Sequence, residues 1–75
     1  MVDRNIFATR LVKLRKEHRV TIVMLAAAIG LTKQSINLFE KERNLPSVDK
    51  LAALADYFDV SIDYLVGRSD VPERR

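Results

Sequence analysis

Several side chains within residues 33–38 could make hydrogen bonds to the edges of nucleic-acid bases. The amide of Gln34 can pair bidentately with adenine, Lys33 can donate to guanine N7 and O6 or to a phosphate, and Asn37 can do either. Leu38 could contact a thymine methyl group, and Ser35, between two of these positions, suits a phosphate oxygen better. The pattern therefore favours base recognition in the major groove of DNA, with an ordinary solvated helix face as the alternative.

These side chains need a short helix to present them, and residues 21–41 have the pattern of two such helices joined by a tight turn. Gly30 follows the last apolar residue of the first helix. Glycine there suits the left-handed conformation of a helix end, which costs other residues about 1 kcal/mol or more. Thr21 and Thr32 can cap the two helices, whose apolar faces are Leu25, Ala26 and Ile29 in the first and Ile36 and Phe39 in the second. The small Ala26 side chain allows the second helix to approach closely.

This joint pattern resembles the Cro/repressor (Xre-type) helix-turn-helix family of bacterial and phage regulators. Its central residues are Ala26, Gly30 and Ile36, with Leu25, Ile29, Leu31 and Phe39 at the neighbouring apolar positions. The resemblance continues over about residues 6–66, through Arg10, Leu11, Leu14, Arg15, Glu40, Leu45, Pro46, Ser47, Leu51, Leu54, Ala55, Phe58, Val60, Ser61 and Leu65. It implies an all-α fold, a compact five-helix bundle of the phage-repressor DNA-binding domain type. It also implies sequence-specific binding of double-stranded DNA by a transcriptional regulator, expected to be a repressor.

The resemblance also assigns residues to the DNA backbone and to the fold. Thr21, at the start of the first of the two helices, and the loop residues Lys41, Arg43 and Asn44 would contact phosphates. The family's arginine at position 15 pairs with the acidic residue at position 40. We therefore expect a structural ion pair between Arg15 and Glu40, with the remaining donors of Arg15 directed toward a phosphate.

The chain departs from the family at two positions. Ile22 occupies the place of a glutamine that grips a phosphate, and Glu42 replaces the usual glycine. Either Glu42 adopts a left-handed conformation, or the preceding helix continues and the loop takes another path. Ile22, Val23, Ala27 and Leu38 could form an exposed apolar patch, so the alternative function is a protein-interaction module on the same fold, antitoxin-like or a co-regulator.

The whole chain reads as one domain with no strands. We expect helices over about 4–18, 22–29, 33–41, 48–58 and 62–66, a DNA-binding domain over residues 1–67 and a flexible tail over 68–75. The first twenty residues have six basic and two acidic side chains, a net charge of +4. Residues 47–66 have one basic and four acidic side chains, a net charge of −3. The domain is therefore expected to have a basic and an acidic side.

Composition argues against other function classes. The chain has no cysteine and a single histidine, His18, so it indicates no metal site, no cofactor and no enzyme activity. No apolar run approaches the length of a membrane span, and a cytoplasmic protein without a membrane or small-molecule partner is expected.

One helix reads only a few base pairs, so a domain of this kind normally binds DNA as two copies on a two-fold site. We therefore expect a homodimer on a palindromic operator. The expected interface is the end of the fourth helix and the fifth helix, with Tyr57, Ile62, Tyr64 and Val66. The alternative is that these side chains only close the core.

Overall fold

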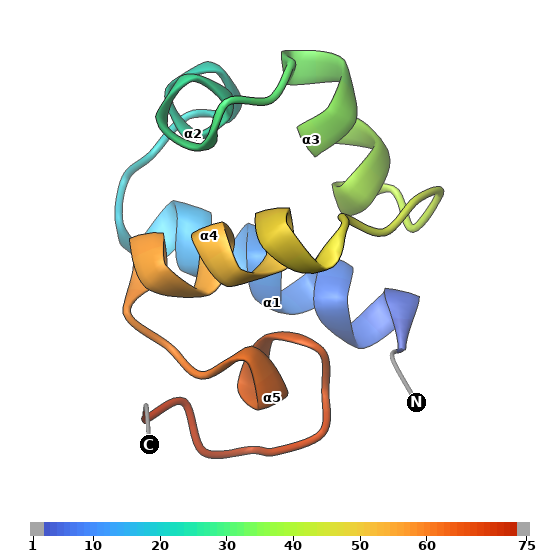
Figure 1. Cartoon of the computed structure of the whole chain (residues 1–75), viewed down its shortest axis with the longest axis vertical. Coiled ribbons are helices and arrows are strands. Elements are labelled where there is room, and N and C mark those ends of the chain that lie inside the picture. Colours follow the sequence, from blue (N-terminus) through green and yellow to red (C-terminus); the bar gives the residue numbers. More distant parts are fainter. Residues whose placement is uncertain (1–2, 74–75) are drawn as a thin grey trace.

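The computed structural model describes residues 3–73 as five α-helices: α1 (Arg4–Glu17), α2 (Ile22–Ile29), α3 (Lys33–Glu40), α4 (Val48–Phe58) and α5 (Ile62–Leu65). Within this range no strand occurs, and the predicted all-α five-helix architecture is confirmed. The pair α2 and α3 lies at one end of the long axis, α5 lies at the other end, and α1 and α4 lie between them (Figure 1).

Each helix begins at a residue whose side chain accepts a hydrogen bond from a free amide of the first turn. The five capping residues are Asp3, Thr21, Thr32, Ser47 and Ser61. The first four amides of a helix have no carbonyl partner inside the helix, so such caps typically stabilise it by about 1 kcal/mol. Four of the five helices are eleven residues or shorter, and helices of this length do not persist alone in water.

Each helix also ends in the same way. One residue just past the helix has a positive φ angle, and the amide of the next residue bonds back to a carbonyl of the last turn, as in the Schellman motif. The left-handed residues are Arg19, Gly30, Glu42, Asp59 and Gly67. The returning bonds run from Val20 to Arg15, Leu31 to Ala26, Arg43 to Leu38, Val60 to Ala55 and Arg68 to Asp63, with N to O distances of 2.8 to 3.0 Å. Sharp ends let five short helices turn back on one another within a Cα radius of gyration of 11.0 Å.

One apolar core joins all five helices. Its largest fully enclosed side chains are Phe7 and Leu11 from α1 and one residue from each other helix, namely Leu25, Ile36, Leu54 and Leu65. The ring of Phe7 meets Phe39 edge to face at 6.0 Å between centroids, which packs α1 against α3. The core therefore fixes the position of α3 from both α1 and α2.

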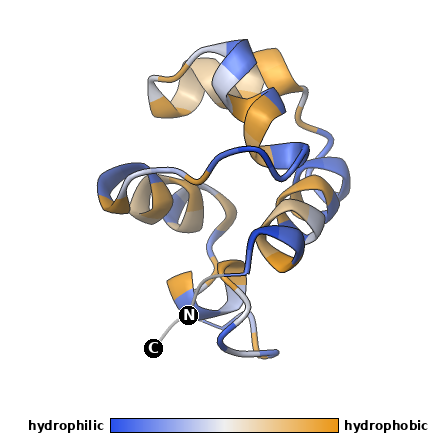
Figure 2. Cartoon of the chain, turned by 90° about the vertical axis from the view of Figure 1, so that its right-hand side faces the viewer, coloured by the Kyte–Doolittle hydropathy of each residue, from blue (hydrophilic) through white to orange (hydrophobic). Residues whose placement is uncertain are grey.

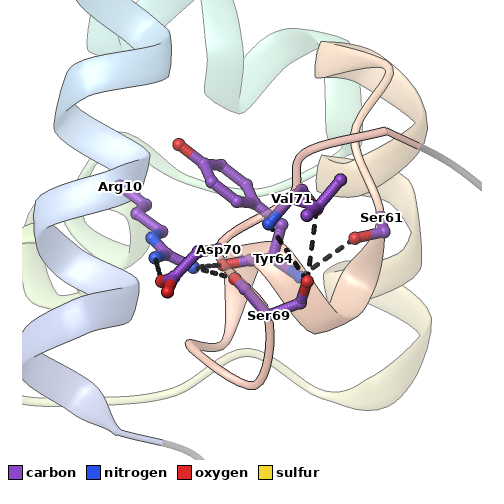
Figure 3. A network of polar contacts seen from close by, with 6 residues as sticks. All are labelled: Arg10, Ser61, Tyr64, Ser69, Asp70 and Val71. Atoms are coloured by element: carbon purple, nitrogen blue, oxygen red, sulfur yellow. Dashed lines mark hydrogen bonds and ion pairs between the residues drawn. The ribbon is translucent and has the colours of Figure 1, made fainter.

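The part of the expected tail that the structure describes, residues 68–73, folds back over α1 and α5. Arg10 on α1 donates to the carbonyl oxygens of Tyr64 and Ser69, and pairs with Asp70 at 3.0 Å (Figure 3). The Ser61 amide, at the start of α5, donates to the Pro72 carbonyl oxygen at 2.9 Å. The packed domain thus extends past Gly67 to Pro72, while the flexibility of the tail stays a prediction and residues 74–75 lie outside the described range.

Replacing Glu42 by glycine should stabilise the fold. Glu42 has φ 63°, a strained value for a residue with a side chain. Its side chain makes one exposed hydrogen bond, in which Oε2 accepts from Asn5 Nδ2 at 3.1 Å, and such a bond offsets little of the strain. We expect Glu42→Gly to raise the free energy of unfolding by about 0.5 to 1 kcal/mol in urea titrations. The matched control is Lys41→Gly, at φ −94°, which should lower it. Equal effects of the two variants would show that the left-handed conformation carries no strain.

Candidate nucleic-acid interface

The turn between α2 and α3 sets the geometry of the candidate site. The two helix axes bend by 113° across residues 30–32, an angle typical of a helix-turn-helix. Gly30 has φ 73°, as its position after α2 predicts, and Ala26 is almost fully buried beneath the turn. Lys50 on α4 donates from Nζ to the Ile29 carbonyl oxygen at 2.9 Å. This cation at the carbonyl end of α2 favours the dipole of that helix and ties the turn to α4.

The polar residues of α3 lie where the sequence predicts them, on the side away from the core. Ile36 and Phe39 are buried, Lys33, Gln34 and Leu38 are exposed, and Ser35 and Asn37 are half-buried. The Ser35 hydroxyl lies 3.0 Å from Thr32 Oγ1, so one of its hydrogen bonds is already used inside the turn. Lys33, Gln34 and Asn37 have no side-chain hydrogen bond or ion pair to another residue in the described range. The first two turns of α3 therefore offer unoccupied donors and acceptors.

Arg15 and Glu40 meet in a two-point ion pair that joins α1 to α3. Arg15 Nε lies 2.7 Å from Glu40 Oε2, and Arg15 Nη2 lies 3.1 Å from Glu40 Oε1. Their side chains are only 16% and 10% exposed. Arg15 Nη1 donates to the Val20 carbonyl oxygen at 3.2 Å, so the same guanidinium also holds the connection between α1 and α2. With a donor on each of three nitrogens already engaged, Arg15 is first a structural residue.

The loop after α3 carries the other basic residues assigned by resemblance. Lys41, Arg43 and Asn44 are all exposed, and the loop that follows α3 is strongly hydrophilic (Figure 2). Asn44 Oδ1 accepts from the Leu45 amide at 3.0 Å, which shapes the loop. Thr21, in contrast, already uses its hydroxyl to accept from the Met24 amide at 3.1 Å. Any further bond of Thr21 to a phosphate therefore has to come from its hydroxyl hydrogen or its backbone amide.

The structure shows the conformation of Glu42 and the packing of Ile22, the two residues at which the chain departs from the family. Glu42 adopts the left-handed conformation, the first of the two expected possibilities, and α3 ends at Glu40. Ile22 is half-buried and packs against the core, whereas its neighbours Val23 and Met24 are more than half exposed. Ile22 therefore contributes to packing at a position where the family uses a polar side chain.

Two of the four residues expected at the dimer interface are buried inside the domain. Tyr64 and Val66 are 7% and 3% exposed, because they close the core between α1 and α5. The Tyr64 ring also receives the Arg10 guanidinium, whose Cζ lies 4.2 Å from the ring centroid. Tyr57 and Ile62, each 40% exposed, are the members of the set that remain available to a partner.

Sequence reasoning missed two sets of long-range contacts, those of Lys50 and Arg10. Lys50 bonds to the Ile29 carbonyl oxygen, and Arg10, only 17% exposed, bonds to the carbonyl oxygens of Tyr64 and Ser69. Backbone carbonyl atoms carry no residue-type signal that could predict such contacts. Within the described residues, no group of three or more His, Cys, Asp or Glu side chains could hold a metal ion, and no single helix could cross a membrane.

The Arg15 and Glu40 pair should be strongly coupled. Removing Glu40 alone leaves a guanidinium that is mostly buried without its counter-charge, which we expect to cost about 2 to 4 kcal/mol of unfolding free energy. A double-mutant cycle with Arg15→Ala and Glu40→Ala in urea should give a coupling of about 1 to 3 kcal/mol. The Arg10 and Asp70 pair is the control, since Asp70 is fully exposed and its coupling should be much smaller. Similar couplings for the two pairs would contradict the structural role.

Comparisons with known proteins agree with this geometry. Residues 11–65 match the helix-turn-helix family. The chain is 43% identical over 67 residues to the uncharacterized HTH-type transcriptional regulator YobD of Bacillus subtilis, covering 89% of this chain and 60% of that protein. It is 36% identical over 59 residues to the cryptic phage CTXphi transcriptional repressor RstR of Vibrio cholerae, covering 79% of this chain and 53% of RstR.

Among solved structures, the P22 c2 repressor in complex with a synthetic operator superposes with a TM-score of 0.81 at 23% identity, over 85% of this chain and 97% of that one, and shows the shared fold. The chain spans little more than half the length of the curated relatives. These relatives are named as regulators rather than enzymes, and they do not favour a protein-interaction module. The chain belongs to the Xre-type helix-turn-helix family of transcriptional regulators.

Proposed function

We propose that this domain binds double-stranded DNA sequence-specifically, with α3 in the major groove, and acts as a transcriptional repressor in the cytoplasm. The observation that carries the proposal is the free polar face of α3, held rigidly by the core, by the Arg15 and Glu40 pair and by the 113° turn. A major groove about 12 Å wide accepts one helix, and each base pair presents a distinct pattern of donors and acceptors there.

Base recognition is assigned to the residues at the start and middle of α3. Gln34 is the main candidate, because it is exposed, unpartnered within the described residues and able to bind adenine at two points. Lys33, Asn37 and Leu38 are the further candidates. Leu38 offers only a methyl contact, so it can discriminate thymine without contributing a hydrogen bond.

Backbone contacts are assigned to residues on either side of α3. Lys41, Arg43 and Asn44 lie in the exposed loop after it, and Thr21 lies at the start of α2, where the amides of Ile22 and Val23 have no partner inside the described structure. Arg15 and Ser35 have fewer free donors, since each already bonds within the protein. Such contacts set affinity and register, whereas base contacts set specificity.

Two copies of the domain are proposed to bind a palindromic operator. One α3 helix reads only a few base pairs, so a homodimer supplies the needed contacts over two half-sites about one helical turn apart. Its interface is proposed at Tyr57 and Ile62, the exposed members of the α4 and α5 surface.

Gln34→Ala and Arg43→Ala should have opposite effects on DNA binding. A random duplex pool selected with the wild-type protein supplies the preferred site. On that site Gln34→Ala should cost about 1 to 3 kcal/mol while binding to random duplex stays nearly unchanged. Arg43→Ala should weaken both duplexes alike and reduce the salt slope by roughly one. Equal losses on both duplexes for Gln34→Ala would exclude base readout, and a pool without enrichment would exclude specific binding altogether.

A charge at position 62 should disrupt the dimer. Ile62→Asp places a carboxylate in the proposed apolar contact, so sedimentation equilibrium should show a weaker association than for the wild type. Val48→Asp is the matched control, because Val48 is 78% exposed at the start of α4 and lies outside the proposed interface. Unchanged association of Ile62→Asp, or equal weakening by both variants, would place the interface elsewhere.

A further inference from the structure

The two ends of α3 are held in place by different contacts. At its C-terminal end, Glu40 bonds to Arg15 on α1 at two points. Its first turn, which carries Gln34, follows directly on the bend at residues 30–32. A helix of eight residues is about 12 Å long, so a rotation of about 5° about the Glu40 end displaces the other end by about 1 Å. The bend therefore decides how accurately the first polar residues of α3 are placed.

Lys50 on α4 reaches this bend from outside the helix-turn-helix. Its amide donates to the capping hydroxyl of Ser47 at 3.3 Å, which fixes the residue in the first turn of α4. Its half-buried side chain lies on the same helix face as Leu54, which is fully buried in the core. Lys50 Nζ donates to the Ile29 carbonyl oxygen at 2.9 Å. This oxygen is among the last four carbonyls of α2, which have no amide partner inside their helix, so α4 supplies a bond that α2 cannot.

The contact is close, and it depends on glycine at position 30. A Cβ atom there would lie 3.3 Å from Lys50 Nζ, closer than side chains normally pack. Gly30 therefore serves two purposes: it adopts a φ of 73°, and it leaves room for the ammonium group beside the Ile29 carbonyl. The position of α4 is thereby transmitted to the residues immediately before α3.

We propose that Lys50 is a positioning residue for base recognition, an inference that rests on the proposed function. Its bond to Ile29 fixes the bend, and the bend fixes the Gln34 amide at the start of α3. Without this bond, Gln34 loses the alignment that bidentate pairing with adenine requires. Contacts to phosphates carry no sequence information, so binding to random DNA changes little. Lys50 performs this role without touching DNA.

Lys50→Met tests the proposal, because methionine fills similar space but cannot donate a hydrogen bond. The measured quantity is the specificity ratio, which is the affinity for the duplex selected with the wild-type protein divided by the affinity for a random duplex. We expect Lys50→Met to lower this ratio by roughly 3- to 10-fold, which is part of the discrimination that one bidentate pair supplies. Partial unfolding lowers both affinities by the same factor, so reduced stability alone leaves the ratio unchanged.

Two comparisons show whether Lys50 acts through Gln34. In a Gln34→Ala background, Lys50→Met should lower the ratio by less than about twofold, because the pairing that it positions is already absent. The full loss in that background would overturn the proposal. Lys13→Met is the matched control: Lys13 is an exposed cation on α1 without a side-chain bond among residues 3–73, and its removal should leave the ratio unchanged.

Other results would overturn the proposal in different ways. A lower urea midpoint of Lys50→Met with an unchanged specificity ratio would restrict Lys50 to the stability of the fold. Equal losses on both duplexes, with the salt slope reduced by about 0.9, would make Lys50 a direct phosphate contact. A wild-type pool without enrichment would overturn the proposed function and this inference with it. Loss of the ratio in Gln34→Ala but not in Lys50→Met would overturn this inference alone.

Discussion

The structure depends on burying enough apolar surface with helices that are too short to exist alone. Four of the five helices have eleven residues or fewer, and α5 has four. Each is stable only because it places at least one side chain in the shared core, and because a capping side chain bonds at least one free amide at its start and a returning amide bonds a carbonyl at its end. The caps and the core therefore act together: the caps fix where each helix starts and stops, and the core fixes where it lies.

The same constraint makes α3 a rigid platform. An exposed helix of eight residues with free polar groups would fray, yet α3 is held on its inner side by Ile36 and Phe39 and at its end by Glu40. Lys50 and Arg15 add bonds from α4 and α1 to the turn and to the α1–α2 connection. Base recognition requires donors and acceptors positioned to within a fraction of an ångström, and the support for α3 comes from its buried side chains and from residues of α1 and α4.

The sequence was sufficient for the local features and for the general arrangement. Helix bounds follow from hydroxyl and carboxylate caps and from 3.6-residue periodicity, and the turn angle follows from Gly30 and Ala26, so these were predictable. The positions of Tyr64 and Val66 were not. An apolar residue in a terminal helix suits a core and an interface equally well, and only the packing of α5 against α1 decides between them. The docking of residues 69–72 was also hidden, because it depends on Arg10 reaching backbone carbonyls some sixty positions away.

Ile22 illustrates how packing and electrostatics can be divided between a side chain and the backbone beside it. A polar side chain there would leave the half-buried space against the core unfilled or would bury an amide beside apolar atoms, which costs free energy unless the amide is bonded. Isoleucine fills the space but offers nothing to an anion. The backbone amides of Ile22 and Val23 have no partner within the described residues, and they lie at the positive end of the α2 dipole. An anion at the start of α2 can therefore be bound by the backbone, and the Ile22 side chain stays free to contribute to the core.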